Sequence, residues 1–93
     1  MKQIPTTSDL ATLGIELDNN GFGPHESTID EIVSLARLVM PDLVAVDVLG
    51  DVVAPDVVRA RAFSVLAAHW RLCHTLLLDQ ARIEVSVPEL VAA

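Results

Sequence analysis

The chain has 93 residues, a formal net charge of −7 and 52% hydrophobic residues, with a mean hydropathy of +0.48. This length predicts a single domain over residues 1–93. Six Lys and Arg stand against 13 Asp and Glu, and Tyr is absent, which excludes the basic footprint and stacking aromatics of ordinary DNA binding. A domain this small cannot bury so much apolar surface alone, so we expect a second chain to cover part of it; a monomer with exposed Ala and Val is the alternative.

Location follows from what the sequence lacks. The most apolar stretch is interrupted by Arg59, Arg61 and Arg71, and no run reaches the roughly 18 uncharged apolar residues of a membrane span. The segment MKQIPTTSDL has no apolar core typical of a secretion signal. A single cysteine allows no internal disulfide, which fits a reducing compartment. We therefore expect a protein with no membrane partner, made in the cytoplasm.

The N-terminal part predicts a loose or partner-bound arm over 1–7 and then a short helix. Thr7 or Ser8 is a suitable N-cap, and Gly14 is expected to end the helix after about two turns. One side of this helix is apolar, with Leu10, Leu13 and Leu17. Residues 18–26 are rich in Asn, Gly and Pro, which predicts a loop.

The middle of the chain predicts a second helix and an ambiguous segment. Thr28 and Glu31 have the spacing of a capping box at the start of an apolar-periodic run. Pro41 is expected to stop or kink this helix. Valines around Gly50 and Asp51 are compatible with a short β-hairpin at 43–54. A second helical piece is preferred there, because two short strands are poorly stable without a third.

The C-terminal part predicts a long helix over about 55–82, with Pro55 in its first turn. Its apolar face is expected to contain Val58, Ala62, Val65, His69, Leu72 and Leu76, widened by Phe63, Leu66, Trp70, Cys73 and Leu77. Pro88 is expected to end regular structure, so residues 84–93 are interpreted as a loose or partner-bound arm, or a strand offered to a neighbour. The fold class is all-α: a small helical bundle with a long C-terminal helix.

The stretch HWRLCHTLLLD places His69, Cys73 and His74 close together in sequence. One helical turn separates His69 from Cys73, as two ligands of one metal would require, but His74 is rotated by about 100° from Cys73. A buried thiol and a histidine with one hydrogen-bonded nitrogen are the simpler interpretation. No metal site is expected, and a metal-binding or redox sensor stays the alternative.

Catalysis is not indicated either. Asp30 with Glu31, or Glu16 with Asp18, are adjacent carboxylates of the kind usually found on solvated surfaces. GFGPHES lacks the Gly-Lys-Ser/Thr of a phosphate-binding loop. No nucleophile, base and orienting group can be named together, so we expect no enzyme and no cofactor.

The order of segments carries a resemblance to a known family. TTSDLATLGIELDNN, TIDEIVSLARLV, VDVLGD and APDVVRARAFSVLAAHW follow one another over residues 6–72. This arrangement resembles the small head–tail connector (adaptor) proteins of tailed phages. The matching positions are Leu10, Leu13, Gly14, Ile15, Leu49, Gly50, Pro55, Val58, Arg59, Ala62, Leu66, Ala67 and Trp70.

The resemblance implies a structural virion protein, assembled in the host cytoplasm. It would self-associate into a ring between portal and tail-completion proteins, and DNA would pass through the lumen without specific binding. Glu16, Asp18, Asp47 and Asp51 are candidates for the channel or subunit surface. The expected interface residues are Val58, Phe63, Leu66, Trp70, Leu77, Val85 and Val87. The alternative function is a small cytoplasmic homodimeric adaptor or regulator, antitoxin-like or factor-binding.

Overall fold

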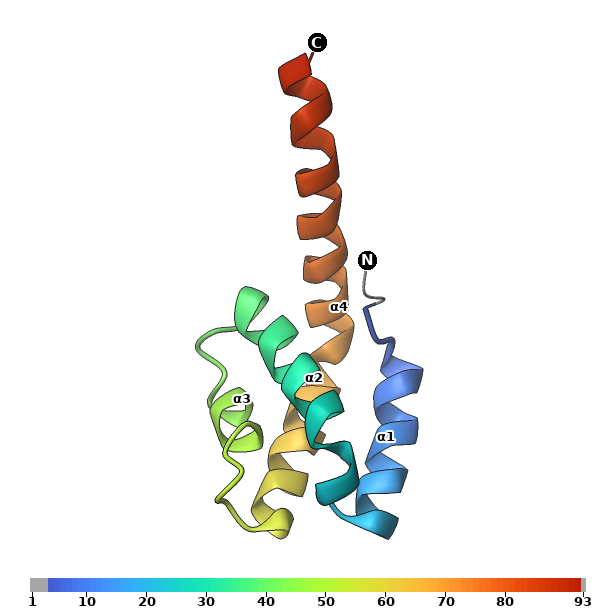
Figure 1. Cartoon of the computed structure of the whole chain (residues 1–93), viewed down its shortest axis with the longest axis vertical. Helices are drawn as coiled ribbons and strands as arrows, with labels where there is room; N and C mark the ends of the chain where they lie inside the picture. Colours follow the sequence, from blue (N-terminus) through green and yellow to red (C-terminus); the bar gives the residue numbers. More distant parts are fainter. Residues whose placement is uncertain (1–3, 93) are drawn as a thin grey trace.

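The computed structural model describes the backbone of residues 4–92 and the side chains of residues 4–81. The described chain is all-helical, in the order α1 (Thr7–Asn20), η1 (Gly23–His25), α2 (Glu26–Val39), α3 (Val44–Leu49) and α4 (Asp56–Ala92). Figure 1 shows α1, α2 and α3 gathered around the first half of α4, whose second half continues beyond them. The expected all-α bundle with a long C-terminal helix is confirmed.

The N-cap of helix α1 lies one residue before the caps suggested by the sequence, and the helix is longer than expected. Its N-cap is Thr6, whose side chain accepts a hydrogen bond from the Asp9 amide at 3.2 Å, while the Asp9 carboxylate accepts one from the Thr6 amide at 2.9 Å. The helix passes through Gly14 and ends before Gly21, which has a φ of 76°. The expectation that Gly14 ends the helix was wrong, because glycine is tolerated inside a helix and the left-handed turn falls at Gly21.

Helix α2 also begins earlier than its sequence signature indicated. It starts at Glu26, directly after η1, whose first turn contains Pro24. Thr28 therefore lies inside the first turn, and its capping box with Glu31 was a wrong prediction. The helix ends at Val39, and the Met40 amide donates to the Ala36 carbonyl at 2.7 Å. Pro41 follows and has no amide to continue the ladder.

The helical piece preferred for the middle segment is confirmed, and the alternative of a short β-hairpin at 43–54 was wrong. Val44–Leu49 forms α3, with Val46 and Leu49 buried and Val44 and Asp47 exposed. Buried positions three residues apart are the spacing of a helix, whereas a strand would alternate. Val46 therefore reaches the core by helical periodicity in spite of the β propensity of valine.

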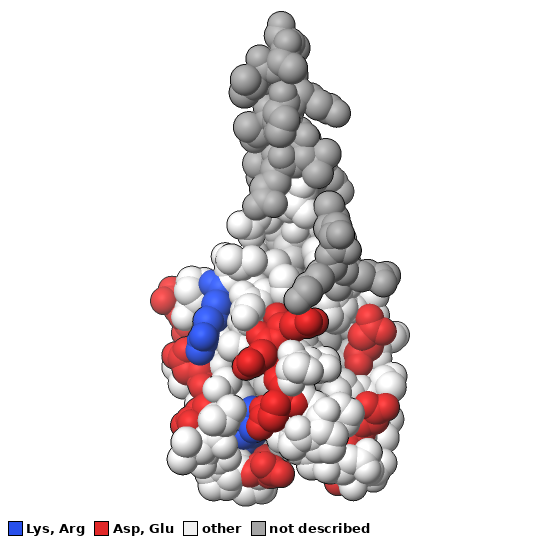
Figure 2. All heavy atoms as spheres, in the orientation of Figure 1, with Lys and Arg blue, Asp and Glu red and all other residues white. Residues whose placement is uncertain are grey.

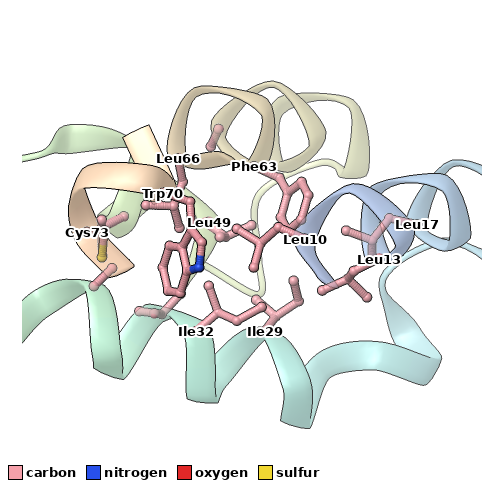
Figure 3. Close-up of a cluster of buried hydrophobic side chains, with 14 of the residues drawn as sticks. Leu10, Leu13, Leu17, Ile29, Ile32, Leu49, Phe63, Leu66, Trp70 and Cys73 are labelled. Carbon is pink, nitrogen blue, oxygen red and sulfur yellow. The ribbon is translucent and has the colours of Figure 1, made fainter. Parts of the chain in front are cut away.

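The core lies between α4 and the other three helices. Figure 3 shows side chains from α1, α2, α3 and α4 converging around Trp70 and Leu10. The Trp70 indole nitrogen donates to the Pro5 carbonyl at 2.7 Å, which holds the segment before α1 against the bundle. Phe63 packs against Gly14, where an added Cβ would lie 3.3 Å from its ring. Close approach of α1 to α4 thus depends on the missing side chain at Gly14.

The buried face of α4 differs from the expected one. Val65, His69, Leu72 and Leu76 were expected on the core face but are exposed. Among the side chains of α4 that the structure describes, the buried ones are Arg59, Ala62, Phe63, Leu66, Trp70, Cys73 and Leu77. The helix carries apolar side chains around most of its circumference, so periodicity alone does not select the face that the other helices cover.

The end of α4 also differs from the expectation. Its backbone continues through Pro88 to Ala92, so regular structure does not end at that proline. A proline removes one hydrogen bond of the helical ladder, but helix can continue on both sides of it. The proposed contact of residues 84–93 with a partner concerns side chains outside the described residues and stays a prediction.

Candidate functional site

The most densely bonded polar group of the described chain is Arg59, near the start of α4. Its side chain is 2% exposed and lies where α2, α3 and α4 meet. Nη1 and Nη2 each donate to one carboxylate oxygen of Glu26 at 2.7 Å. Nε and Nη2 donate to the Leu49 carbonyl at 3.1 and 2.9 Å. The guanidinium carbon also lies 4.5 Å from the centre of the Phe22 ring, within cation–π range.

The electrostatics of this cluster favour the charged forms of both partners. Hydrogen bonds from Arg59 lower the pKa of the Glu26 carboxyl, against a smaller opposing effect of burial. The bond to Glu26 likewise raises the pKa of Arg59. Bidentate geometry of this kind is among the strongest side-chain pairings.

Arg59 acts as an internal connection between helices and leaves little capacity for a ligand. The guanidinium bonds join the start of α2, the end of α3 and the first turn of α4. Its burial was not predicted, because arginine is usually exposed. One signal was present: Arg59 precedes Ala62, Phe63 and Leu66 by three, four and seven residues, which places it on their face of the helix.

The His69–Cys73–His74 cluster does not form a shared site. Cys73 is fully buried, and burial raises the pKa of its thiol to about 11, which disfavours the reactive thiolate. His69 is exposed, and its Nδ1 lies 2.8 Å from the Val65 carbonyl, to which it donates when it carries the proton. Among the described residues, no three His, Cys, Asp or Glu side chains gather as a metal site would require.

One histidine pairing was not predicted. His25 Nε2 lies 3.7 Å from a carboxylate oxygen of Glu16, across the turn between α1 and η1. The pair was missed because its members are far apart in sequence and meet only through the turn at Gly21. Its exposed carboxylate makes it a surface contact.

The residues predicted for a subunit interface fall into three groups. Phe63, Leu66, Trp70 and Leu77 are at most 5% exposed and belong to the core of the single chain. They therefore have almost no surface to offer a partner, because the chain's own helices cover them. Val58 is 40% exposed and stays a candidate. Val85 and Val87 lie outside the residues whose side chains are described.

The opposite side of α4 carries exposed apolar side chains along the part of the helix whose side chains are described. Val65, Leu72 and Leu76 are 44%, 57% and 36% exposed, and each lies on the side away from the core. Exposed basic side chains lie beside them, and the sequence has no acid between Asp56 and Asp79. We call this surface the α4 strip and define it as Arg61, Val65, Ala68, Arg71, Leu72 and Leu76.

A groove lies beside this strip, between α1 and α4. It has a volume of about 430 Å³, and its lining combines larger apolar side chains, among them Leu17 and Phe63, with small ones. Ala11 and Gly14 contribute from α1, and Ala60, Ser64 and Ala67 from α4. Asp18 and Arg61 are charged groups among its lining residues. Its shape and apolar floor suit a side chain or a helix edge better than a polar metabolite.

The outer surfaces of the other helices are acidic. Figure 2 shows acidic side chains spread over the face formed by α1, α2 and α3, with few basic ones among them. Arg37 on this side is paired with Asp47 at 3.5 Å. Charge is therefore divided between an acidic face and the basic, apolar α4 strip.

Comparison with known protein families, curated proteins and solved structures finds no match for this chain. No helix within the described residues has both the length and the apolar composition needed to cross a membrane. Any function must therefore be argued from the surfaces described above.

Proposed function

We propose that this chain is a structural subunit of a tailed-phage virion, a head–tail connector that forms a ring between portal and tail-completion proteins. The observation that carries the proposal is the α4 strip, an apolar face that the chain's own bundle leaves exposed. Contiguous exposed apolar surface on a small domain is typical of protein–protein interfaces. An exposed apolar face supports many kinds of assembly. Among them we favour the connector ring, because the order of segments in this chain resembles that of connector proteins.

The charge distribution supports passage of DNA without binding. The chain carries −7 overall, and most of its acids lie between Asp9 and Asp51, where Figure 2 shows acidic side chains spread over the face formed by α1, α2 and α3. Carboxylates that line a channel repel phosphates, so DNA slides past such a surface. Arg59 would not counter this effect, because its guanidinium is engaged by Glu26 and Leu49. The proposal includes no catalytic step and no cofactor.

The test is the assembly state in the presence of phage components. The purified chain is mixed with portal and tail-completion proteins, and the products are measured by light scattering and negative-stain imaging. We expect ring-shaped particles that contain the chain at one end of the portal. A chain that forms a stable dimer and ignores both components contradicts the proposal.

A second candidate is a cytoplasmic homodimeric adaptor or regulator. It is favoured by the spacing of Val65, His69, Leu72 and Leu76, which are four, three and four residues apart on the exposed side of α4. This is the spacing of a two-helix coiled-coil seam. The same mixing experiment separates the candidates, because this one gives a dimer of fixed mass that does not join a portal complex.

A further inference from the structure

A second exposed apolar surface lies on α3 and the loop that follows it. Val44, Val52 and Val53 are 70%, 66% and 87% exposed, which is unusual for three valines so close in sequence. Acidic side chains alternate with them, in contrast to the α4 strip. We call this surface the α3 patch and define it as Val44, Asp47, Asp51, Val52 and Val53.

The α3 patch and the α4 strip are complementary in composition. Each combines three exposed large apolar side chains with two charged groups, and the charges are of opposite sign. Arg61 and Arg71 form no ion pair among the residues that the structure describes, so both are available to a partner. Asp47 lies beside the exposed Arg37, at 3.5 Å. One carboxylate oxygen of Asp51 accepts a hydrogen bond from the Val53 amide at 3.0 Å, and the side chain is exposed. Apolar contact gives affinity, and opposite charge sets orientation and excludes the wrong partner.

A strip-to-strip contact between two copies is disfavoured by the same charges. Two strips would bring four arginines together with no acid from either strip, and like charges across an interface are costly. Two α3 patches would bring four aspartates together, and the Arg37 beside each Asp47 would offset only part of that charge. Only the contact between unlike surfaces pairs apolar with apolar and basic with acidic.

We propose that the α4 strip of one copy docks on the α3 patch of a second copy of this chain. The two surfaces share no residue and lie on different elements, so one copy offers both. Such a contact is heterologous: a bound pair still has a free α3 patch on one copy and a free α4 strip on the other. Repetition produces a ring if the rotation between copies closes, and an open filament if it does not. This inference rests on the proposed function and names the surfaces that would build the ring.

The test uses two variants that each lose one surface. Leu72→Glu with Arg71→Glu spoils the strip, and Val53→Gln with Asp47→Asn spoils the patch without making it basic, so the two spoiled surfaces do not attract each other. All four positions are exposed, so the core is left intact. Leu38→Glu is the matched control, because Leu38 is 61% exposed on α2 and belongs to neither surface. Mass is measured by sedimentation over a concentration series up to about millimolar, and circular dichroism checks the fold of each variant.

We expect the wild type and the Leu38→Glu chain to form oligomers larger than dimers. Each double variant should be monomeric alone. Mixing the two should restore one intact contact and produce a 1:1 pair that grows no further. A patch variant that still dimerises, or a mixture that stays monomeric, overturns the inference. A wild type that stays monomeric throughout the series also overturns it.

Failure of this inference differs from failure of the proposed function. Rings that join a portal but survive both double variants would retain the connector function and reject these surfaces. Filaments or short chains that require both surfaces but never join a portal would retain the contact and reject the connector function.

Discussion

The Arg59 side chain holds α2, α3 and α4 together through its hydrogen bonds. Replacing it by Met keeps its apolar stem but removes the donors to the Glu26 carboxylate and the Leu49 carbonyl. Removing one partner of a buried pair costs about 3–5 kcal/mol; because the Glu26 side chain is 37% exposed, we expect about 2–3 kcal/mol. Urea unfolding followed by circular dichroism measures the loss.

An exposed arginine provides the matched control for this substitution. Arg37 lies 3.5 Å from Asp47, and both side chains are more than half exposed. Such surface pairs contribute about 0–1 kcal/mol, so Arg37→Met should hardly move the unfolding midpoint. An equal loss of unfolding free energy in the Arg59→Met and Arg37→Met variants would contradict the role of Arg59 in holding the three helices together.

Glu26 gives the fold a pH dependence of known sign. Hydrogen bonds from Arg59 lower the pKa of this carboxyl below its usual value of 4.5 in the folded chain. The folded state therefore binds the proton less readily than the unfolded state does, and the pair stabilises the fold above pH 4.5. This contribution is lost as the pH falls through the lowered folded-state pKa.

The Glu26→Gln variant isolates this contribution, because its side chain does not titrate. The difference in unfolding free energy between wild type and variant should be largest near neutral pH and shrink as the pH falls below about 4.5. Urea titrations at several pH values give this difference directly. A difference that stays constant over the whole range would show that the Arg59 pair does not set the titration of this carboxyl.

At the scale of the element, α1 is capped by reciprocal hydrogen bonds between Thr6 and Asp9. Thr7 and Ser8 were equally suitable N-caps by residue type. Thr6→Ala removes the acceptor of the Asp9 amide, and loss of an N-cap costs about 1 kcal/mol. Thr7→Ala and Ser8→Ala are the controls, since the structure places both inside the helix. We expect a lower thermal unfolding midpoint for Thr6→Ala alone. A lower midpoint for Thr7→Ala or Ser8→Ala instead would show that Thr6 is not the N-cap.

Much of the helical architecture could be predicted from local sequence. Pro41 ends α2 as expected, and the proline before α4 marks the start of the long helix. Such signals work because a proline removes a backbone donor wherever it stands. Gly14 and Thr28 misled because their local preferences take no account of the rest of the chain: α1 continues through Gly14, and α2 already starts at Glu26, directly after η1. Gly14 lets the Phe63 ring of α4 pack closely against α1. Phe63 is far from Gly14 in the sequence, so no local pattern predicts this contact.

The exposed surfaces were harder to predict than the helices. In α4 the sequence shows apolar residues on nearly every side, so the choice of buried face depends on where α1, α2 and α3 lie. The buried face of α4 is the one that contains Arg59, whose charge is neutralised by Glu26 of α2. As a result Trp70 became core, while Leu72 became surface. Which face of such a helix is buried depends on the packing of the whole fold and not on the periodicity of its own sequence.

At the scale of the whole molecule, the division of charge predicts how salt affects self-association. If the α4 strip meets the α3 patch, arginines face aspartates across the contact, and added salt screens their attraction. If two strips met instead, Arg61 and Arg71 would face their own copies, and salt would screen a repulsion. The apolar contact is common to both arrangements, so the sign of the salt effect distinguishes them.

We therefore expect association to weaken between about 50 and 500 mM NaCl, where the screening length falls from above 10 Å to below 8 Å. Sedimentation velocity at matched protein concentrations measures the shift. Arg61→Gln with Arg71→Gln should flatten the response, because the charges that salt screens are gone while the apolar side chains of the strip remain. Association that strengthens with salt in the wild type would indicate a strip-to-strip dimer, the assembly that suits the adaptor function and not the ring.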